Sequence, residues 1–388
     1  MRRIPIKFIL FCQFVIGITF VPQAQPRELS NGAQISLLTE GPGEELYSGY
    51  GHTGIRVRDD LQQLDIVFHY GLFNFDAPGF YVNFLKGKLN YSMGATYFHN
   101  FYQSAELEQR TLTEQILRLN QTEKQKLYQL LLDNYKPENR QYWYDFFYDN
   151  CATRPRDLFE KAWSGNLKYA DVTPSRSFRE LLQHHQRYFP WIDLGIDLLH
   201  GANTDKIVPV RDEMFLPVFL HDHLAVATVK NAPAIQSEKT LLSFPEQALP
   251  SFWQLPGFFF LLLLLIEIYI SLLWRNDRRS WWIYIYDRLW FVTISLSSLL
   301  MLFMWLGTAH YATKNNWNVL WASPLFWWLS IAKLKHTTSI TRTVLKGVFI
   351  LLVLTLLGWY FIPQSFNIAV LPVLLILTLK TGRYLWIK

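Results

Sequence analysis

The chain has 388 residues, two cysteines and a formal net charge of +6. The charge is unevenly spread: residues 27–250 carry 22 basic and 28 acidic side chains, whereas residues 251–388 carry 12 basic and 3 acidic ones. The net positive charge therefore comes mainly from the C-terminal part, where it fits the topology of a membrane domain. It does not indicate a nucleic-acid-binding surface.

Residues 1–24 have the pattern of a secretory signal peptide. Basic residues precede an apolar run, Phe8 to Val21, that is short for a bilayer span, and Pro22-Gln23-Ala24 follows it. We expect cleavage near Ala24 and export of the residues that follow. An uncleaved membrane anchor is the alternative.

Residues 25–230 are long enough for one large core and predict an exported α+β domain. Alternating polar and apolar residues predict strands near residues 33–38, 52–58, 65–70 and 89–93. Asn120-Gln121-Thr122-Glu123 has the spacing of a capping box and predicts a helix that ends before Pro137. Residues 231–251 have the composition of a polar linker into the next domain.

Cys151 and His52 are the first candidates for chemistry. The other cysteine, Cys12, lies in the leader, so the exported domain keeps one thiol without an intramolecular disulfide partner. A cysteine with a histidine is the minimum for thiol-based acyl transfer. His69 lies on the next predicted strand, and Asp65 shares its face.

A helix is expected after Cys151, over residues 156–163. If the thiol opens this helix, the helix dipole lowers the pKa of the thiol. Pro155, however, is tolerated in the first turn of a helix, which allows Thr153 to be the N-cap, with Cys151 just before the helix. The sequence leaves both starts open.

Longer motifs surround the candidate residues. They are Leu37-Leu38-Thr39 with Gly41-Pro42-Gly43, Gly51-His52 with Ile55-Arg56-Val57, Phe68-His69-Tyr70-Gly71, Pro137-Glu138-Asn139-Arg140, and Phe146-Phe147-Tyr148-Asp149-Asn150-Cys151-Ala152-Thr153-Arg154. Together they resemble the Lnb family of bacterial inner-membrane lipoprotein N-acyltransferases, over most of residues 33–217. The segment from His310 to Pro324 extends the resemblance. The order of His52, His69 and Cys151 also resembles circularly permuted papain-like folds, such as the lecithin:retinol acyltransferase-like and NlpC-like groups.

The resemblance implies an enzyme that moves an acyl chain from a phospholipid, through a thioester on Cys151, to the N-terminal amine of a lipoprotein. His52 would be the base and His69 would orient it, although an asparagine is common in the family at the position of His69. Residues expected to bind substrate are Tyr148, Asn150, Arg154, His310, Asn316 and Asn318. We expect no cofactor and no metal, since His221 and His223 would share a strand face without a third ligand.

Residues 252–388 predict an all-α membrane domain of about five spans. The apolar runs cover residues 253–274, 288–307, 317–332, 345–362 and 366–380. Basic residues gather in alternate connections and after the last run: Arg275, Arg278, Arg279, Arg288, Lys333, Lys335, Arg342, Lys346, Lys380, Arg383 and Lys388. The positive-inside rule places them in the cytoplasm, with the exported domain in the periplasm. Glu267, inside the first run, is a weaker functional candidate.

Two other functions stay open. One is a membrane-tethered thiol peptidase or amidase that acts on cell-wall peptide with water as the acceptor. The other is a non-catalytic exported sensor. Five spans exceed what tethering needs, which favours a lipid substrate, and the paired histidine and cysteine disfavour the sensor.

Overall fold

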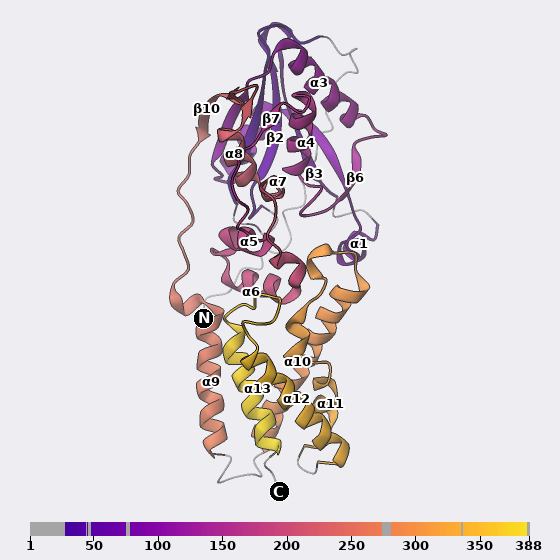
Figure 1. The fold of residues 1–388 in the computed structure, drawn as a ribbon, viewed down its shortest axis with the longest axis vertical. Coiled ribbons are helices and arrows are strands. Elements are labelled where there is room, and N and C mark those ends of the chain that lie inside the picture. The colour runs from indigo at the N-terminus through magenta and orange to yellow at the C-terminus, as the bar shows by residue number, and fades with distance from the viewer. Residues whose placement is uncertain are drawn as a thin grey trace, which may run out of the picture.

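The computed structural model describes residues 28–43, 45, 48–74, 78–273, 281–334 and 337–385. The predicted signal peptide lies outside the described residues, and so do Arg275, Arg278, Arg279, Lys335 and Lys388 of the topology argument. The molecule is elongated, with a sheet-rich N-terminal domain at one end and a bundle of helices at the other (Figure 1). A sheet domain followed by a helical domain is what the sequence predicted.

A seven-stranded antiparallel sheet forms the centre of the N-terminal domain, in the order β10-β5-β1-β2-β3-β4-β6. The strands are β1 (Gln34–Glu40), β2 (His52–Asp59), β3 (Leu64–Leu72), β4 (Leu89–Tyr97), β5 (Leu112–Leu117), β6 (Gln141–Tyr144) and β10 (Ile235–Leu242). The four predicted strands correspond to β1 to β4 and are confirmed. The prediction of a linker over residues 231–251 is wrong for its first half, because β10 pairs with β5 and covers what would otherwise be an open sheet edge. Residues 243–251 contain no helix or strand.

Helices cover both faces of this sheet. On one face, Leu37 and Ile55 belong to a core that includes residues of α3 (Gln121–Tyr135) and α4 (Thr153–Ala162). On the other face, α2 (Phe98–Leu107) packs Phe101 against Leu38 and Val67. The predicted capping box at the start of α3 is present. Such a cap stabilises a helix by about 1 kcal/mol.

A layer of short helices, which we call the collar, joins the sheet to the bundle. It comprises α5 (Phe178–Gln186), α6 (Pro190–Leu199), η2 (Ala202–Asp205), α7 (Val210–Glu213) and α8 (Pro217–Val226), beside the small sheet of β7 (Leu167–Lys168), β8 (Thr228–Val229) and β9 (Ala232–Pro233). Buried Arg179 contacts Asp197 at 2.5 Å and Asp205 at 2.8 Å. This guanidinium therefore ties α5 to α6 and η2.

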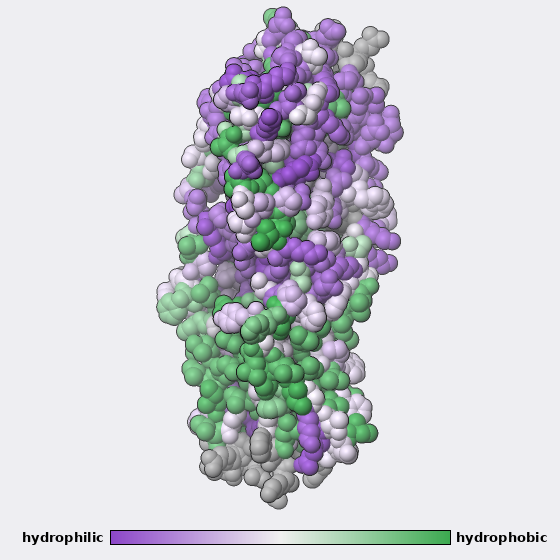
Figure 2. Space-filling view, viewed as in Figure 1, coloured by the Kyte–Doolittle hydropathy of each residue, from purple (hydrophilic) through white to green (hydrophobic). Residues whose placement is uncertain are grey.

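The bundle is built from α9 (Pro256–Leu273), α10 (Trp281–Gly307), α11 (Phe326–Ile331), α12 (Ser339–Leu357) and α13 (Val370–Leu385). Among the described helices, α10 and α12 are long and apolar enough to cross a membrane, and α9 is a slightly shorter apolar helix. Figure 2 shows hydrophobic residues over most of the visible bundle surface and polar residues over the N-terminal domain. The outward side chains of the bundle are those expected next to lipid.

The third predicted span, residues 317–332, is not one continuous helix. It consists of η5 (Trp317–Leu320), a turn and the six residues of α11. Pro324 breaks it, because proline lacks an N–H and disfavours a helical residue before it. Arg288, predicted in a connection, lies inside α10 and donates to the carbonyls of Ser330 and Ala332. The arginine thus satisfies carbonyls at the end of α11.

Four charged side chains meet inside the bundle, each almost fully buried. Lys380 lies 2.6 Å from Glu267 and 2.7 Å from Asp287. Arg383 lies 2.9 Å from Glu267 and 2.7 Å from Asp287. Lys380 and Arg383 were predicted to follow the last span, but they lie within α13. The two acidic and two basic side chains neutralise one another. Lys380 and Arg383 are therefore not charges exposed at the membrane interface.

Removing one member of this network should destabilise the bundle strongly. Asp287→Asn leaves two buried cations with one carboxylate, and breaking a buried ion pair costs about 3–5 kcal/mol. We expect a clear fall in the thermal unfolding midpoint of the full chain in detergent. The double variant Asp287→Asn/Lys380→Met, which removes one charge of each sign, should recover part of the loss.

Leu265→Ala is the matched control, because Leu265 lies on α9 and its side chain faces outward. Its midpoint should stay near that of the wild type. A wild-type midpoint for Asp287→Asn would show that the network contributes little to stability.

Candidate functional site

Strands β2 and β3 bring His52 and His69 together. Gly54 pairs directly with His69 in the sheet, so His52, two residues earlier on β2, shares the face of His69. The Nε2 atom of His52 lies 3.1 Å from Nδ1 of His69, with the rings perpendicular. Asp65 instead contacts Arg56 at 2.7 Å. The structure thus places His69, and not Asp65, beside His52.

The residues beside His69 in the sheet are glycines, Gly54 on β2 and Gly94 on β4. A Cβ atom at Gly54 would lie 2.6 Å from Val67, and one at Gly94 would collide with Leu72. Both glycines therefore allow close packing of the sheet next to His69.

The turn before α4 is held by the side chain of Asn150, which is buried. Its Oδ1 atom accepts from the N–H groups of Ala152 at 2.8 Å and Thr153 at 2.9 Å. Its Nδ2 atom donates to the carbonyls of Phe146 at 2.7 Å and Phe215 at 2.9 Å. Asn150 was expected to bind substrate, but its whole amide is used inside the fold.

Cys151 lies just before α4, which begins at Thr153 with Pro155 in its first turn. The N-cap is Ala152, one residue before the predicted Thr153, so the later of the two predicted starts is right to within one residue. The hydroxyl of Thr53 donates to the carbonyl of Cys151. Since Thr53 follows His52 on β2, this bond brings the half-buried thiol to the end of the strand that carries the histidine. His69 contacts Nε2 of His52, so Nδ1 is the ring nitrogen of His52 that this contact leaves unused.

Burial decides the protonation of this site. It raises the pKa of Cys151 to about 11, although backbone hydrogen bonds at Thr53 and Cys151 lower the pKa in part. Burial also holds the pKa of His52 well below its usual range and lowers the pKa of His69 to about 4. The expectation of a lowered thiol pKa is wrong, because the low-dielectric surroundings outweigh the helix dipole. At neutral pH the site holds a neutral thiol and neutral imidazoles.

Sequence reasoning missed an ion pair next to the site. Glu40 pairs with His52 in the register of β1 and β2, and Arg110 contacts Glu40 at 2.7 Å. Both side chains are buried, and burial raises the pKa of Glu40 to about 7 in spite of Arg110. The charge of Arg110 lowers the pKa of Cys151, whereas the charge of Glu40 raises the pKa of Cys151. The sequence shows that Glu40 ends an apolar strand, but it does not show that Arg110, far along the chain, is the partner of Glu40.

Arg154, Tyr148 and His310 remain partly exposed. Arg154 contacts Asp149 at 2.5 Å, and its guanidinium lies 3.6 Å from the ring centre of Tyr142. The ring of Tyr148 lies 5.6 Å from that of Tyr311, in η4 (Tyr311–Thr313). His310, the residue before η4, contacts the carbonyl of Phe84 at 3.0 Å. Tyr148 and His310 therefore lie where the N-terminal domain meets the bundle.

Asn316 and Asn318 are fully buried and bind the end of α6. Asn316 donates to the carbonyls of Leu198 at 2.8 Å and Leu199 at 3.1 Å. Asn318 donates to those of Asp197 and Leu198, both at 3.2 Å. The last carbonyls of a helix lack partners within it, and these amides supply them. The structure gives both residues a place in the fold, where substrate contacts were expected.

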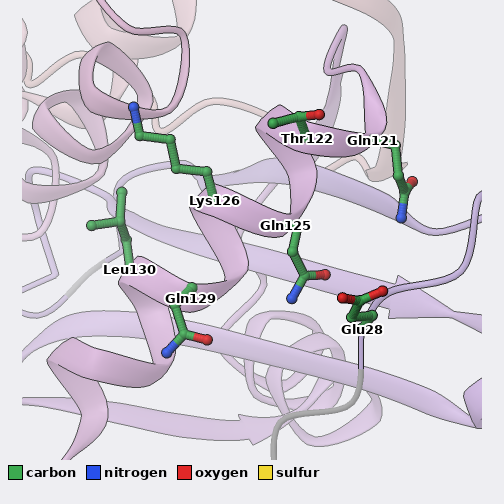
Figure 3. Close-up of a pocket in the computed structure, with 7 residues that line it drawn as sticks. All are labelled: Glu28, Gln121, Thr122, Gln125, Lys126, Gln129 and Leu130. Atoms are coloured by element: carbon green, nitrogen blue, oxygen red, sulfur yellow. The ribbon is translucent and has the colours of Figure 1, made fainter.

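Other features of the described residues do not add to the site. No group of three His, Cys, Asp or Glu side chains there could hold a metal ion. His221 and His223 lie on helix α8, where a strand was expected. A surface pocket along α3 is lined by Glu28, Gln121, Thr122, Gln125, Lys126, Gln129 and Leu130 (Figure 3). Lys126 donates to Ser164, just beyond α4, so this pocket lies at the far end of α4 from Cys151.

Fold and site together define a class of protein: a sheet domain with a cysteine and two histidines, joined to a helical domain with an apolar surface. Residues 28–184 match the family model of the Lnb N-terminal periplasmic domain, and residues 249–388 match that of the Lnb transmembrane domain. The chain belongs to the Lnb family, as its motifs suggested. The sheet domain is thus a periplasmic domain and the bundle a transmembrane domain. No curated protein and no solved structure matches the chain.

The thiol of Cys151 should titrate far above a free cysteine, whose pKa is about 8.5. In a Cys12→Ser chain, alkylation by iodoacetamide should be slow at pH 7 and should rise towards pH 11, because burial raises the pKa of Cys151 to about 11. Glu40→Gln should lower the apparent pKa and Arg110→Met should raise it, since the two charges act with opposite signs.

Asp65→Asn is the control, because it disrupts the more distant ion pair with Arg56 on the same sheet. It should leave the titration unchanged. The conclusion that the thiol is neutral at pH 7 would be contradicted if alkylation of the wild type had its midpoint at or below the pKa of free cysteine.

Proposed function

We propose that this protein is a membrane-bound acyltransferase that moves an acyl chain from a phospholipid to the N-terminal amine of a lipoprotein. The observation that carries the proposal is that Thr53, next to His52 on β2, binds the carbonyl of Cys151, while His52 contacts His69. Membership of the Lnb family and the adjoining apolar bundle support a lipid substrate.

In the first half-reaction, Nδ1 of His52 takes the proton of the Cys151 thiol, and the sulphur attacks the ester carbonyl carbon of the phospholipid. The carbon–oxygen bond to the glycerol breaks, and His52 returns the proton to the departing lysophospholipid. His69 holds the other nitrogen of His52, which fixes the tautomer that can accept a proton at Nδ1. Backbone N–H groups near Cys151 are suited to stabilise the oxyanion.

In the second half-reaction, the lipoprotein amine attacks the thioester carbonyl. His52 takes a proton from the amine, the carbon–sulphur bond breaks, and the proton returns to the sulphur of Cys151. The product amide is formed only if the amine reacts faster than water. The aromatic residues around the site, such as Tyr142 and Phe147, are buried and are suited to exclude water.

The domain fits a circularly permuted papain-like fold, since both histidines come from the sheet and precede a cysteine at a helix start. We place the bundle in the inner membrane with the C-terminus in the cytoplasm. The end of α13 lies at the end of the bundle away from the sheet domain (Figure 1). Lys333, Arg342 and Lys346 of the positive-inside argument support the same orientation.

Replacing the nucleophile should abolish acyl transfer. Cys151→Ala should reduce the rate by several orders of magnitude, because no thioester can form. Labelled phospholipid should leave a hydroxylamine-sensitive label on the wild type and none on this variant. Unchanged folding and membrane insertion serve as the control. N-acylation of lipoproteins by Cys151→Ala at the wild-type rate would refute the thioester route, and cleavage of cell-wall peptide by the wild type would favour the peptidase.

The two histidines should respond differently to substitution. His52→Ala should slow acyl-enzyme formation at pH 7 by about 10²–10⁴-fold. The rate should recover partly as the pH rises towards about 11, because the buried thiol then ionises without a base. His69→Asn keeps a hydrogen-bonding partner for His52 and should be mild, whereas His69→Leu should be worse. The measurement is single-turnover acylation against pH. Equal losses for His69→Asn and His52→Ala would show that the roles are misassigned.

A further inference from the structure

Helix α1 (Phe80–Lys86) is unusually apolar for a surface helix. Its exposed side chains include Tyr81 at 68%, Val82 at 53%, Phe84 at 46% and Leu85 at 49%. All residues of the helix are partly or fully exposed. Such a patch is unfavourable in water and marks a binding surface.

The position of α1 relative to the bundle indicates what covers it. The carbonyl of Lys86 accepts from the N–H of Ala309 at 2.9 Å, and that of Phe84 contacts His310 at 3.0 Å. Ala309 and His310 follow the end of α10 at Gly307. Figure 1 shows α1 beside this end of α10. The helix therefore lies at the level where a membrane-spanning helix leaves the bilayer.

A row of aromatic contacts leads from α1 towards the thiol. The ring centres of Phe80 and Phe73 are 5.8 Å apart, those of Phe73 and Tyr91 are 5.1 Å apart, and those of Tyr91 and Tyr144 are 4.4 Å apart. Phe73, Tyr91, Tyr144 and Cys151 pack in the same hydrophobic cluster. The row of aromatic rings therefore runs from α1 into the hydrophobic cluster against which Cys151 packs.

We propose that α1 inserts into the outer leaflet and that this aromatic row guides a phospholipid acyl chain to Cys151. The second part rests on the proposed acyl transfer, whereas the insertion of α1 does not. Lys86 and Lys88, both exposed, flank the apolar residues and are suited to lipid phosphate groups. The apolar side chains of α1 suit the acyl region of a bilayer, and the basic residues at its end suit the head groups.

The insertion is tested without reference to activity. In a Cys12→Ser/Cys151→Ser chain reconstituted in phosphatidylethanolamine and phosphatidylglycerol vesicles, Leu85→Cys carries a nitrobenzoxadiazole probe. Lipids with a spin label on the acyl chain should quench it. Leu61→Cys is the matched control, because Leu61 is 84% exposed and lies in η1 (Asp60–Gln62) of the N-terminal domain. Equal quenching at the two positions would overturn the insertion.

The delivery is tested with Phe84→Ser/Leu85→Ser in the chain that retains Cys151. Acylation of Cys151 by phospholipid vesicles should slow more than tenfold, because two apolar side chains that hold α1 in the lipid are lost. Alkylation by iodoacetamide should be unchanged, and Leu61→Ser should behave as the wild type. Wild-type acylation by the double variant would overturn the delivery route, as would an equal loss of alkylation. Failure of the wild type to acylate would instead refute the proposed function and leave the quenching result standing.

Discussion

The side chain of Asn150 is the constraint on which the site depends. Its amide makes four hydrogen bonds, two to the start of α4 and two to carbonyls of Phe146 and Phe215. Because the group is buried, each lost partner would leave a polar atom unsatisfied, at a cost of about 1–3 kcal/mol. The turn that carries Cys151 is therefore fixed at once to α4, to the collar and to the aromatic loop, by which we mean residues 142–148. Thr53 then sets the distance between this turn and β2.

A neutral resting site follows from the same burial. An ion pair of thiolate and imidazolium would have to overcome desolvation, which here raises the pKa of Cys151 and lowers that of His52. The thiolate and the imidazolium must therefore form during the reaction itself. The neighbouring Glu40 and Arg110 act on the pKa of the thiol with opposite signs, and neither overcomes the effect of burial. Histidine as a base, correctly oriented, carries the greater part of thiol activation in the proposed mechanism.

Local patterns predicted the strands β1 to β4, the capping box at Asn120 and, through the family motifs, the three residues of the candidate site. Features that depend on distant partners were not predictable. Strand β10 exists because β5 offers an edge, and Glu40 meets Arg110 only through the order of the sheet. In the bundle, charge alone suggested that Lys380 lies outside the span, whereas Glu267 and Asp287 neutralise it inside.

The collar fixes the distance of the Cys151 thiol from the membrane. Asn316 and Asn318 hold the end of α6, and Arg179 holds α6 to the helix that packs beneath the aromatic loop. In the proposed reaction the lipid must therefore move to Cys151, because the domain is tied to the bundle by buried polar contacts. Lifting an acyl chain into water costs about 0.8 kcal/mol for each CH₂ group. A lipid-dependent reaction at this height requires an apolar route, and the aromatic side chains between α1 and the thiol are placed to supply one.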